Sequence, residues 1–357
     1  MNDRIPPGSD DRAEKTSVWA LLWHPRARAI YKILLAAAVL AVLHRKKLLD
    51  FSIFSREHLD LPCVVAAALI VLPVFPIVAW RFQAILRSVG LDAPYPRAFQ
   101  WTMIGEFFST ALPMSTGGDL VKALYAAQTY GKGRRGIAVL AVLMDRVVGL
   151  FGLFLFALLV CLIGGRTIDD NPRLAGLTLF LTIICGGGML GFWLTIQPWV
   201  ETNAWRKRAM ARLPLGEKLE RVYTGLCEMR RRKRRLFLVL GLSLLNHSLW
   251  CAMLLVLSRG LGQNLDLVES LVVIPLCLFL NTFGFAGGFG AGELAFEVLF
   301  QAMLGAPAGT GTGLAFAYHV LQAIERVLVG LPFYLFTPKP REPIGETNGD
   351  DATASGT

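Results

Sequence analysis

The sequence predicts an all-α polytopic membrane protein: an inverted-repeat helical bundle with two re-entrant segments. The first observation is composition, because 54% of the 357 residues are hydrophobic and only 17% are charged, whereas soluble domains carry roughly 25% charged residues. The second is a duplicated pattern, in which a glycine-broken apolar segment precedes an acid–arginine pair. The third is the placement of basic residues, which orients the two copies oppositely across the membrane.

The duplicated pattern is most visible at its acids. Asp119 follows Gly117-Gly118, and Glu293 follows a glycine-rich run 174 positions later. The pair Asp145-Arg146 returns as Glu325-Arg326, 180 positions later. A membrane chain that repeats one such unit is typical of transporters built from two halves. We expect repeat 1 over about 29–165 and repeat 2 over about 174–336.

The first elements follow from hydropathy and charge. Residues 1–28 are polar and basic without a cleavage signal, which predicts a cytoplasmic lead. Residues 30–43 form a short span and residues 61–80 a second one. Prolines at 73 and 76 should kink the second span. The arginines in 81–97 indicate a cytoplasmic linker.

The rest of the first half contains the first re-entrant segment. Residues 98–115 are apolar, yet both flanks, 81–97 and 122–135, are basic. A full crossing would break the positive-inside rule, so we expect the segment to dip into the membrane and return at the glycines. Residues 137–163 then cross outward, with Asp145 about 12 Å along the helix and close to the midplane.

The second half is oriented by its strongest basic segment. Residues 174–197 return inward, and residues 199–235 carry twelve Lys and Arg against four Glu. Next to a span, this charge indicates a cytoplasmic loop that attracts anionic lipid headgroups, especially over 206–235, and it does not indicate a nucleic-acid site.

The remaining elements complete an inverted copy of the first half. Residues 236–257 cross outward, 267–292 form the second re-entrant segment, and 312–336 return to the cytoplasm. The polar tail 337–357 should be disordered. Both termini are therefore expected in the cytoplasm.

The acids after the glycines allow two interpretations. Asp119 and Glu293 start predicted helices, where a carboxylate can cap free N–H groups and complement the positive helix end. Alternatively, a helix end near the membrane centre presents its dipole and charge to a lipid headgroup. The residues alone do not separate a cap from a binding role.

The intramembrane arginines need partners. Adjacent residues diverge by about 100° around a helix, so Arg146 and Arg326 should not pair with the acids beside them. We predict that Asp119 pairs with Arg146 and Glu293 with Arg326. Each pair is a structural lock, a phosphate site, or both, because a buried arginine can bind a phosphate with two hydrogen bonds. With no lipid bound, Asp145 and Glu325 would also help to hold these arginines.

Other polar residues lie within apolar stretches. Glu106, Asn246-His247 and His319 are each either satisfied buried groups or proton sites. No metal-binding spacing, nucleophile elbow or phosphate loop occurs, so no catalytic residue, metal or cofactor is predicted. The pattern favours a transporter over an enzyme.

The run Leu112-Pro113, Gly118-Asp119, Lys122 and then Asp145-Arg146 resembles the membrane domain of the lysylphosphatidylglycerol synthase, flippase-like family. The second glycine cluster, which includes Gly288 and precedes Glu293, is similar to that family's other glycine motif. Two features depart from the pattern: Asp119 and Lys122 stand where the family has Glu and Arg, and the proline expected before the second cluster is absent. The synthases' aminoacyl-transferase domain does not occur in this sequence, so the resemblance implies only the flippase part.

The resemblance implies translocation of a polar-headed lipid, either a phospholipid or a polyprenyl- or hopanoid-linked lipid, across the inner (plasma) membrane. The predicted translocation residues share positions at the glycine breaks or inside apolar segments: Glu106, Gly117, Gly118, Asp119, Lys122, Asp145, Arg146, His247, Gly288, Glu293, His319, Glu325 and Arg326. The alternatives are an intramembrane lipid-modifying enzyme and a non-catalytic subunit of a lipid or glycolipid biosynthesis complex. A biosynthetic enzyme or a second copy of the chain remains open as a partner.

Overall fold

The computed structural model describes residues 59–111, 117–130, 134–168, 172–212, 216–231, 233–281 and 291–337. Every regular element in these ranges is a helix. Five segments are long and apolar enough to cross a membrane: Leu61–Ser88, Arg135–Ile163, Pro172–Leu194, Lys233–Gly260 and Thr310–Phe336. They match the five predicted spans that fall in the described part, which confirms an all-α polytopic membrane protein. Three predicted segments lie outside the described residues: the lead 1–28, the remaining span 30–43 and the tail 338–357.

The first described span is broken by proline. Helix α3 (Leu61–Val71) ends before Leu72-Pro73, and α4 (Val74–Ser88) begins directly after it. Pro76 lies in the first turn of α4, where a missing N–H leaves no hydrogen bond unmade. The helix then continues to Ser88, so the prediction that residue 81 begins a cytoplasmic linker is wrong: Arg81 lies inside α4 and is buried.

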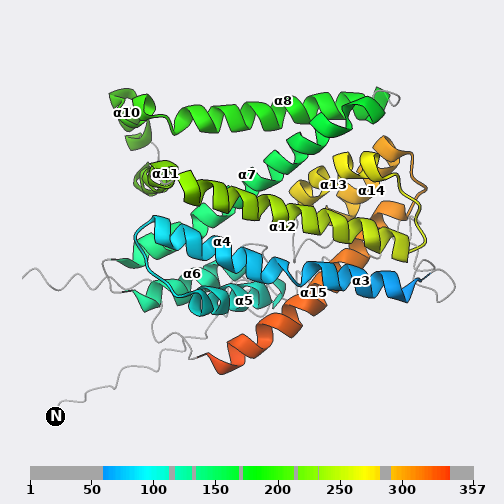
Figure 1. The fold of residues 1–357 in the computed structure, drawn as a ribbon, viewed down its shortest axis with the longest axis horizontal. Coiled ribbons are helices and arrows are strands. Elements are labelled where there is room, and N and C mark those ends of the chain that lie inside the picture. Colours follow the sequence, from blue (N-terminus) through cyan, green and yellow to red (C-terminus); the bar gives the residue numbers. More distant parts are fainter. Residues whose placement is uncertain are drawn as a thin grey trace, which may run out of the picture.

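Two helical hairpins occupy the regions predicted to be re-entrant. The first joins α5 (Tyr95–Ala111) to α6 (Gly117–Thr129), and the second joins α13 (Leu267–Asn281) to α14 (Ala291–Leu304). Each helix has 17 residues or fewer, whereas a membrane crossing needs about 20. In Figure 1 the first hairpin lies at the left end of the molecule and the second at the right end.

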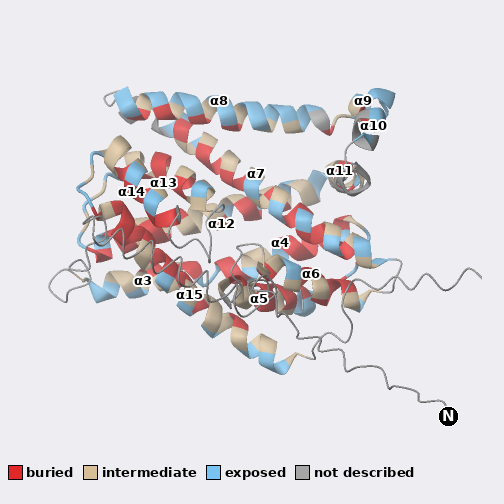
Figure 2. Cartoon of the chain, turned by 180° about the vertical axis from the view of Figure 1, so that it is seen from behind, coloured by how far each residue is buried: buried red, intermediate tan, exposed pale blue. Residues whose placement is uncertain are grey.

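The long helices connect the two ends. Helices α7 (Arg135–Ile168), α12 (Lys233–Gly260) and α15 (Thr310–Phe336) pass through the centre, where α7 packs on α12 and α15 packs on α5. Helix α8 (Pro172–Thr195) lies along the outside against α7, and Figure 2 shows most of its residues exposed.

The basic segment forms helices, and part of its charge is used internally. It contains α9 (Pro198–Glu201), α10 (Ala204–Ala211) and α11 (Gly216–Arg231). Arg206 pairs with Glu220, while Arg230 and Arg231 both reach Glu201. Burial raises the pKa of Tyr223 in α11 to about 12, so its hydroxyl stays protonated at neutral pH.

The hydrophobic core of the described residues has two large parts, and a small third cluster contains Ile196, Tyr223 and Cys227. One surrounds α3, α13, α14 and the first half of α15, and the other surrounds the second half of α4 with α5, α6 and the start of α7. Phe75 of α4 belongs to the first part and Phe82 to the second. Arg81, in the same helix, therefore lies near the place where the two parts meet.

Gly118 sets how closely α5 and α6 approach. A Cβ added there would lie 2.1 Å from the Gly105 carbonyl oxygen and 2.0 Å from Ser109 Oγ. We expect Gly118→Ala to push the hairpin apart and to lower the unfolding temperature by several degrees, because overpacking costs about 1–3 kcal/mol. Gly241→Ala is the control, since nothing lies within 4 Å of a Cβ there and alanine favours a helix interior. Thermal unfolding in detergent compares the two variants, and equal temperatures for both would contradict this close approach.

Candidate functional site

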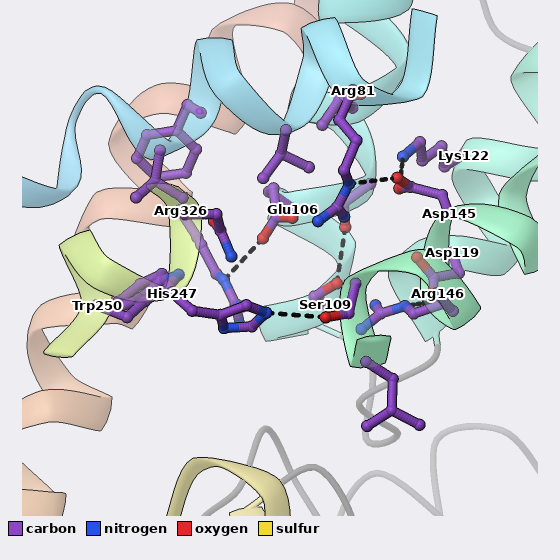
Figure 3. A pocket seen from close by; sticks show the side chains of 18 of the residues that line it. Arg81, Glu106, Ser109, Asp119, Lys122, Asp145, Arg146, His247, Trp250 and Arg326 are labelled. Atoms are coloured by element: carbon purple, nitrogen blue, oxygen red, sulfur yellow. Dashed lines mark hydrogen bonds and ion pairs between the residues drawn. The ribbon is translucent and has the colours of Figure 1, made fainter. Parts of the chain in front are cut away.

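A cavity of about 220 Å³ with charged side chains in its lining lies between the first hairpin and the central helices. Four cationic side chains and three carboxylates line it, which gives one net positive charge with histidine neutral. Figure 3 shows these side chains converging from α4, α5, α6, α7 and α15. The charged lining residues are Arg81, Glu106, Asp119, Lys122, Asp145, Arg146 and Arg326.

The most buried part of the lining is a triad around Asp145. Arg81 Nε donates to Asp145 Oδ1 at 2.8 Å, and Lys122 Nζ donates to Asp145 Oδ2 at 2.9 Å. Arg81 also donates to Ser243 Oγ, and Lys122 lies 3.7 Å from the centre of the Phe82 ring. The side chains of the triad are at most 8% exposed. One carboxylate here neutralises only one of two buried cations, so the triad connects α4, α6 and α7 and keeps a positive charge.

The second ion pair confirms a sequence prediction. Arg146 of α7 donates through Nε to Asp119, the third residue of α6. The Arg146 side chain is 48% exposed, in contrast to the triad beside it. Asp145 and Arg146 thus diverge as expected for neighbours on a helix, and the arginine faces the accessible side of the cavity.

The third ion pair corrects a sequence prediction. Arg326 of α15 donates to Glu106 of α5 at 2.9 Å, with the two side chains 21% and 26% exposed. The predicted pair of Arg326 with Glu293 is wrong. The pairing crosses between the two sequence halves because α15 packs along α5, which brings Arg326 to Glu106.

Glu293 has a different partner. Its Oε1 lies 2.9 Å from His319 Nδ1, and His319 Nε2 lies 3.0 Å from Asn281 Oδ1. Gly292 makes this contact possible, since a Cβ there would lie 2.4 Å from Asn281 Oδ1. The cluster links the second hairpin to α15, as the Asp119–Arg146 pair links the first hairpin to α7.

A second cavity of about 200 Å³ adjoins the first. Both are lined by Arg146, Arg326, His247 and Trp250, and the second extends to Asn281. His247 Nε2 lies 2.9 Å from the Gly149 carbonyl oxygen. A carbonyl can only accept, so Nε2 carries a proton and Nδ1 is the titratable nitrogen of neutral His247.

The remaining predicted residues are placed as follows. Gly117 and Gly118 are the first two residues of α6, and Gly288 lies outside the described residues. Asp145 and Glu325 do not hold the arginines beside them, so that prediction is wrong: Asp145 binds Arg81 and Lys122. Glu325 is buried, and neither carboxylate oxygen has a hydrogen-bond partner in the described part of the chain.

Arg81 is the charged residue of the first cavity that the sequence prediction does not include. Its position before Arg87 and Arg97 predicts a cytoplasmic linker. A signal was available in the helix periodicity, since Arg81 lies three and seven residues after the cavity-lining Val78 and Val74.

The comparisons with known proteins give one finding. The family model of the lysylphosphatidylglycerol synthase TM region matches residues 29–330. No curated protein matches the chain, and no solved structure matches it. The matched range contains every charged residue of the cavity. With its membrane-spanning helices and this match, the chain belongs to the lysylphosphatidylglycerol synthase TM region family and is a multi-pass membrane protein of lipid metabolism or translocation.

Proposed function

We propose that this protein translocates a lipid with an anionic, phosphate-containing headgroup between the leaflets of the inner membrane. The observation that carries the proposal is the pair of arginines, Arg146 and Arg326, in the lining of both cavities. Each is held by one carboxylate and remains partly exposed. A phosphate could replace that carboxylate as a two-oxygen partner of the guanidinium.

The charge balance supports an anionic ligand. A phosphate carried through hydrocarbon loses its hydration, which is costly unless charged donors replace the water. The cavity supplies one net positive charge and two accessible guanidinium groups. The buried Asp145 triad connects helices in this scheme and does not bind the headgroup, because its side chains are too enclosed to contact it.

The two hairpins suit lipid transfer between leaflets. Each presents the start of a helix, at Gly117 in α6 and at Ala291 in α14, where free N–H groups and the helix dipole favour an anion. We propose that both hairpins are re-entrant and belong to an inverted repeat. Acyl chains would stay in the surrounding lipid while the headgroup passes the arginines.

The proposed orientation puts the basic segment in the cytoplasm. Trp199 and Trp205 are exposed there, as expected for side chains at a membrane interface, and the Arg231 side chain is 59% exposed although it pairs with Glu201. The orientation predicts that Asp92→Cys and Arg231→Cys react with a membrane-impermeant thiol reagent only from the inside, and Asn264→Cys only from the outside. The labelling uses spheroplasts and inverted vesicles in a background without the six native cysteines. Reaction of residue 92 only from outside would reject this orientation.

Reconstitution of the full chain in liposomes tests the function itself. We expect a fluorescent phosphatidylglycerol added to one leaflet to appear in the other, with no change in its mass. A chemically altered lipid would instead indicate an intramembrane enzyme. Neither exchange nor alteration above that of protein-free liposomes would reject translocation and leave a supporting subunit.

A further inference from the structure

Glu325 of α15 is a buried carboxyl group that accepts no hydrogen bond from any residue that the structure describes. The residue is 5% exposed, and both oxygens are unpartnered among the residues that the structure describes. Glu297 of α14 shows the usual arrangement at similar burial: it accepts from Gly309 N at 2.6 Å and from Thr312 N at 2.8 Å. Since a buried carboxylate needs such donors, the surroundings of Glu325 suit the neutral, protonated form.

Among the described residues, no charged group forms a hydrogen bond with the Glu325 carboxyl group. Arg326 acts on Glu325 electrostatically, but it donates its hydrogen bond to Glu106. Helix α15 packs against α5, α14 and α12. Four ionisable side chains of these helices have partners: Glu106 with Arg326, Glu293 with His319, Glu297 with Gly309 and Thr312, and His247 with Gly149. Cys251 of α12 is a buried free thiol.

We propose that Glu325 is a proton-binding site and that its proton binds together with the anionic headgroup. The inference rests on the proposed function. When the Glu325 O–H bond breaks, the proton passes to water and a carboxylate remains beside Arg326. Arg326 would then face two negative charges, and the cavity would attract a phosphate less strongly. By linkage, a bound phosphate must favour the protonated state to the same extent.

A route for the proton lies on the same helix face. Gln322 and Tyr318 precede Glu325 by three and seven residues, so the three side chains form one stripe on α15. Gln322 and Tyr318 line the second cavity, and Gln322 Nε2 donates to the Tyr318 hydroxyl at 2.9 Å. Water in the second cavity is therefore the proton acceptor that this geometry favours.

The test is the pH dependence of headgroup binding by the purified full chain. Titration with a soluble short-chain phosphatidylglycerol should show affinity falling about fivefold or more from about pH 5 to about pH 9. Glu325→Gln mimics the protonated state, so it should bind at the low-pH affinity throughout. Glu269→Gln, at the start of α13, is the control and should keep the wild-type dependence.

Two outcomes separate this inference from the proposed function. If Glu325→Gln keeps the wild-type pH dependence, the proton site is wrong while headgroup binding stands. If Arg146→Gln with Arg326→Gln leaves binding unchanged, the proposed function itself is wrong.

Infrared spectroscopy gives a readout that does not depend on binding. The wild-type protein should show a protonated-carboxyl C=O band at neutral pH that Glu325→Gln lacks. Where Glu325→Gln does not fold, Glu325→Asp should retain that band at a shifted frequency and retain the pH dependence. If neither Glu325→Gln nor Glu325→Asp changes this C=O band, the proposal is wrong.

Discussion

Asp145→Asn is expected to be the most destabilising single substitution among the cavity residues. It removes the carboxylate that both Arg81 and Lys122 contact, and it leaves two cations enclosed without a counter-charge. Breaking a buried ion pair in this way costs about 3–5 kcal/mol, a large share of the stability of a typical protein. We expect the variant to aggregate in detergent or to unfold at a much lower temperature than the wild type. Size-exclusion chromatography of heated samples measures this temperature.

Lys122→Met should be much milder than Asp145→Asn. It leaves Arg81 and Asp145 as a balanced pair, and methionine can replace the lysine methylenes beside Phe82. The variant Asp145→Asn, Arg81→Gln, Lys122→Met has no charge left in the triad and should recover part of the stability.

Asp92→Asn is the matched surface control for the triad. Its side chain is 94% exposed and pairs only loosely with Arg87, so we expect no measurable change. If Lys122→Met were as damaging as Asp145→Asn, packing rather than charge compensation would explain the triad.

The spans and one of the two predicted ion pairs could be read from the sequence because they depend on local features. Long apolar runs define α7, α12 and α15 wherever they pack. The glycine break starts α6 at Gly117, which places Asp119 in its first turn. Arg146 then meets Asp119 because α6 and α7 are successive, packed helices.

The other ion pairs depend on packing between segments that are far apart in sequence. Glu106 and Arg326 meet because α5 packs on α15, and nothing in either local sequence specifies that neighbour. The repeat predicts that each arginine pairs with an acid of its own half, whereas Glu293 pairs with His319. Local charge predicts a linker at Arg81, but α4 continues through this residue and buries it.

The structure also changes the expected consequence of losing Arg146. A fully buried arginine would be needed for folding, but the Arg146 side chain is 48% exposed and Arg326 is 21% exposed. Partly exposed ion pairs contribute less to stability than fully enclosed ones. We therefore expect Arg146→Gln with Arg326→Gln to fold, and to lose function instead.

Leaflet exchange by this double variant is the most direct test of phosphate binding by the two arginines. In liposomes, with labelled phosphatidylglycerol, we predict exchange reduced about a hundredfold or more, because hydrogen bonds to charged groups contribute about 1.5–3 kcal/mol each. Arg259→Gln replaces an exposed arginine at the end of α12, away from both cavity linings, and should exchange lipid at the wild-type rate. Exchange by a folded Arg146→Gln, Arg326→Gln protein at the rate of Arg259→Gln would contradict the account.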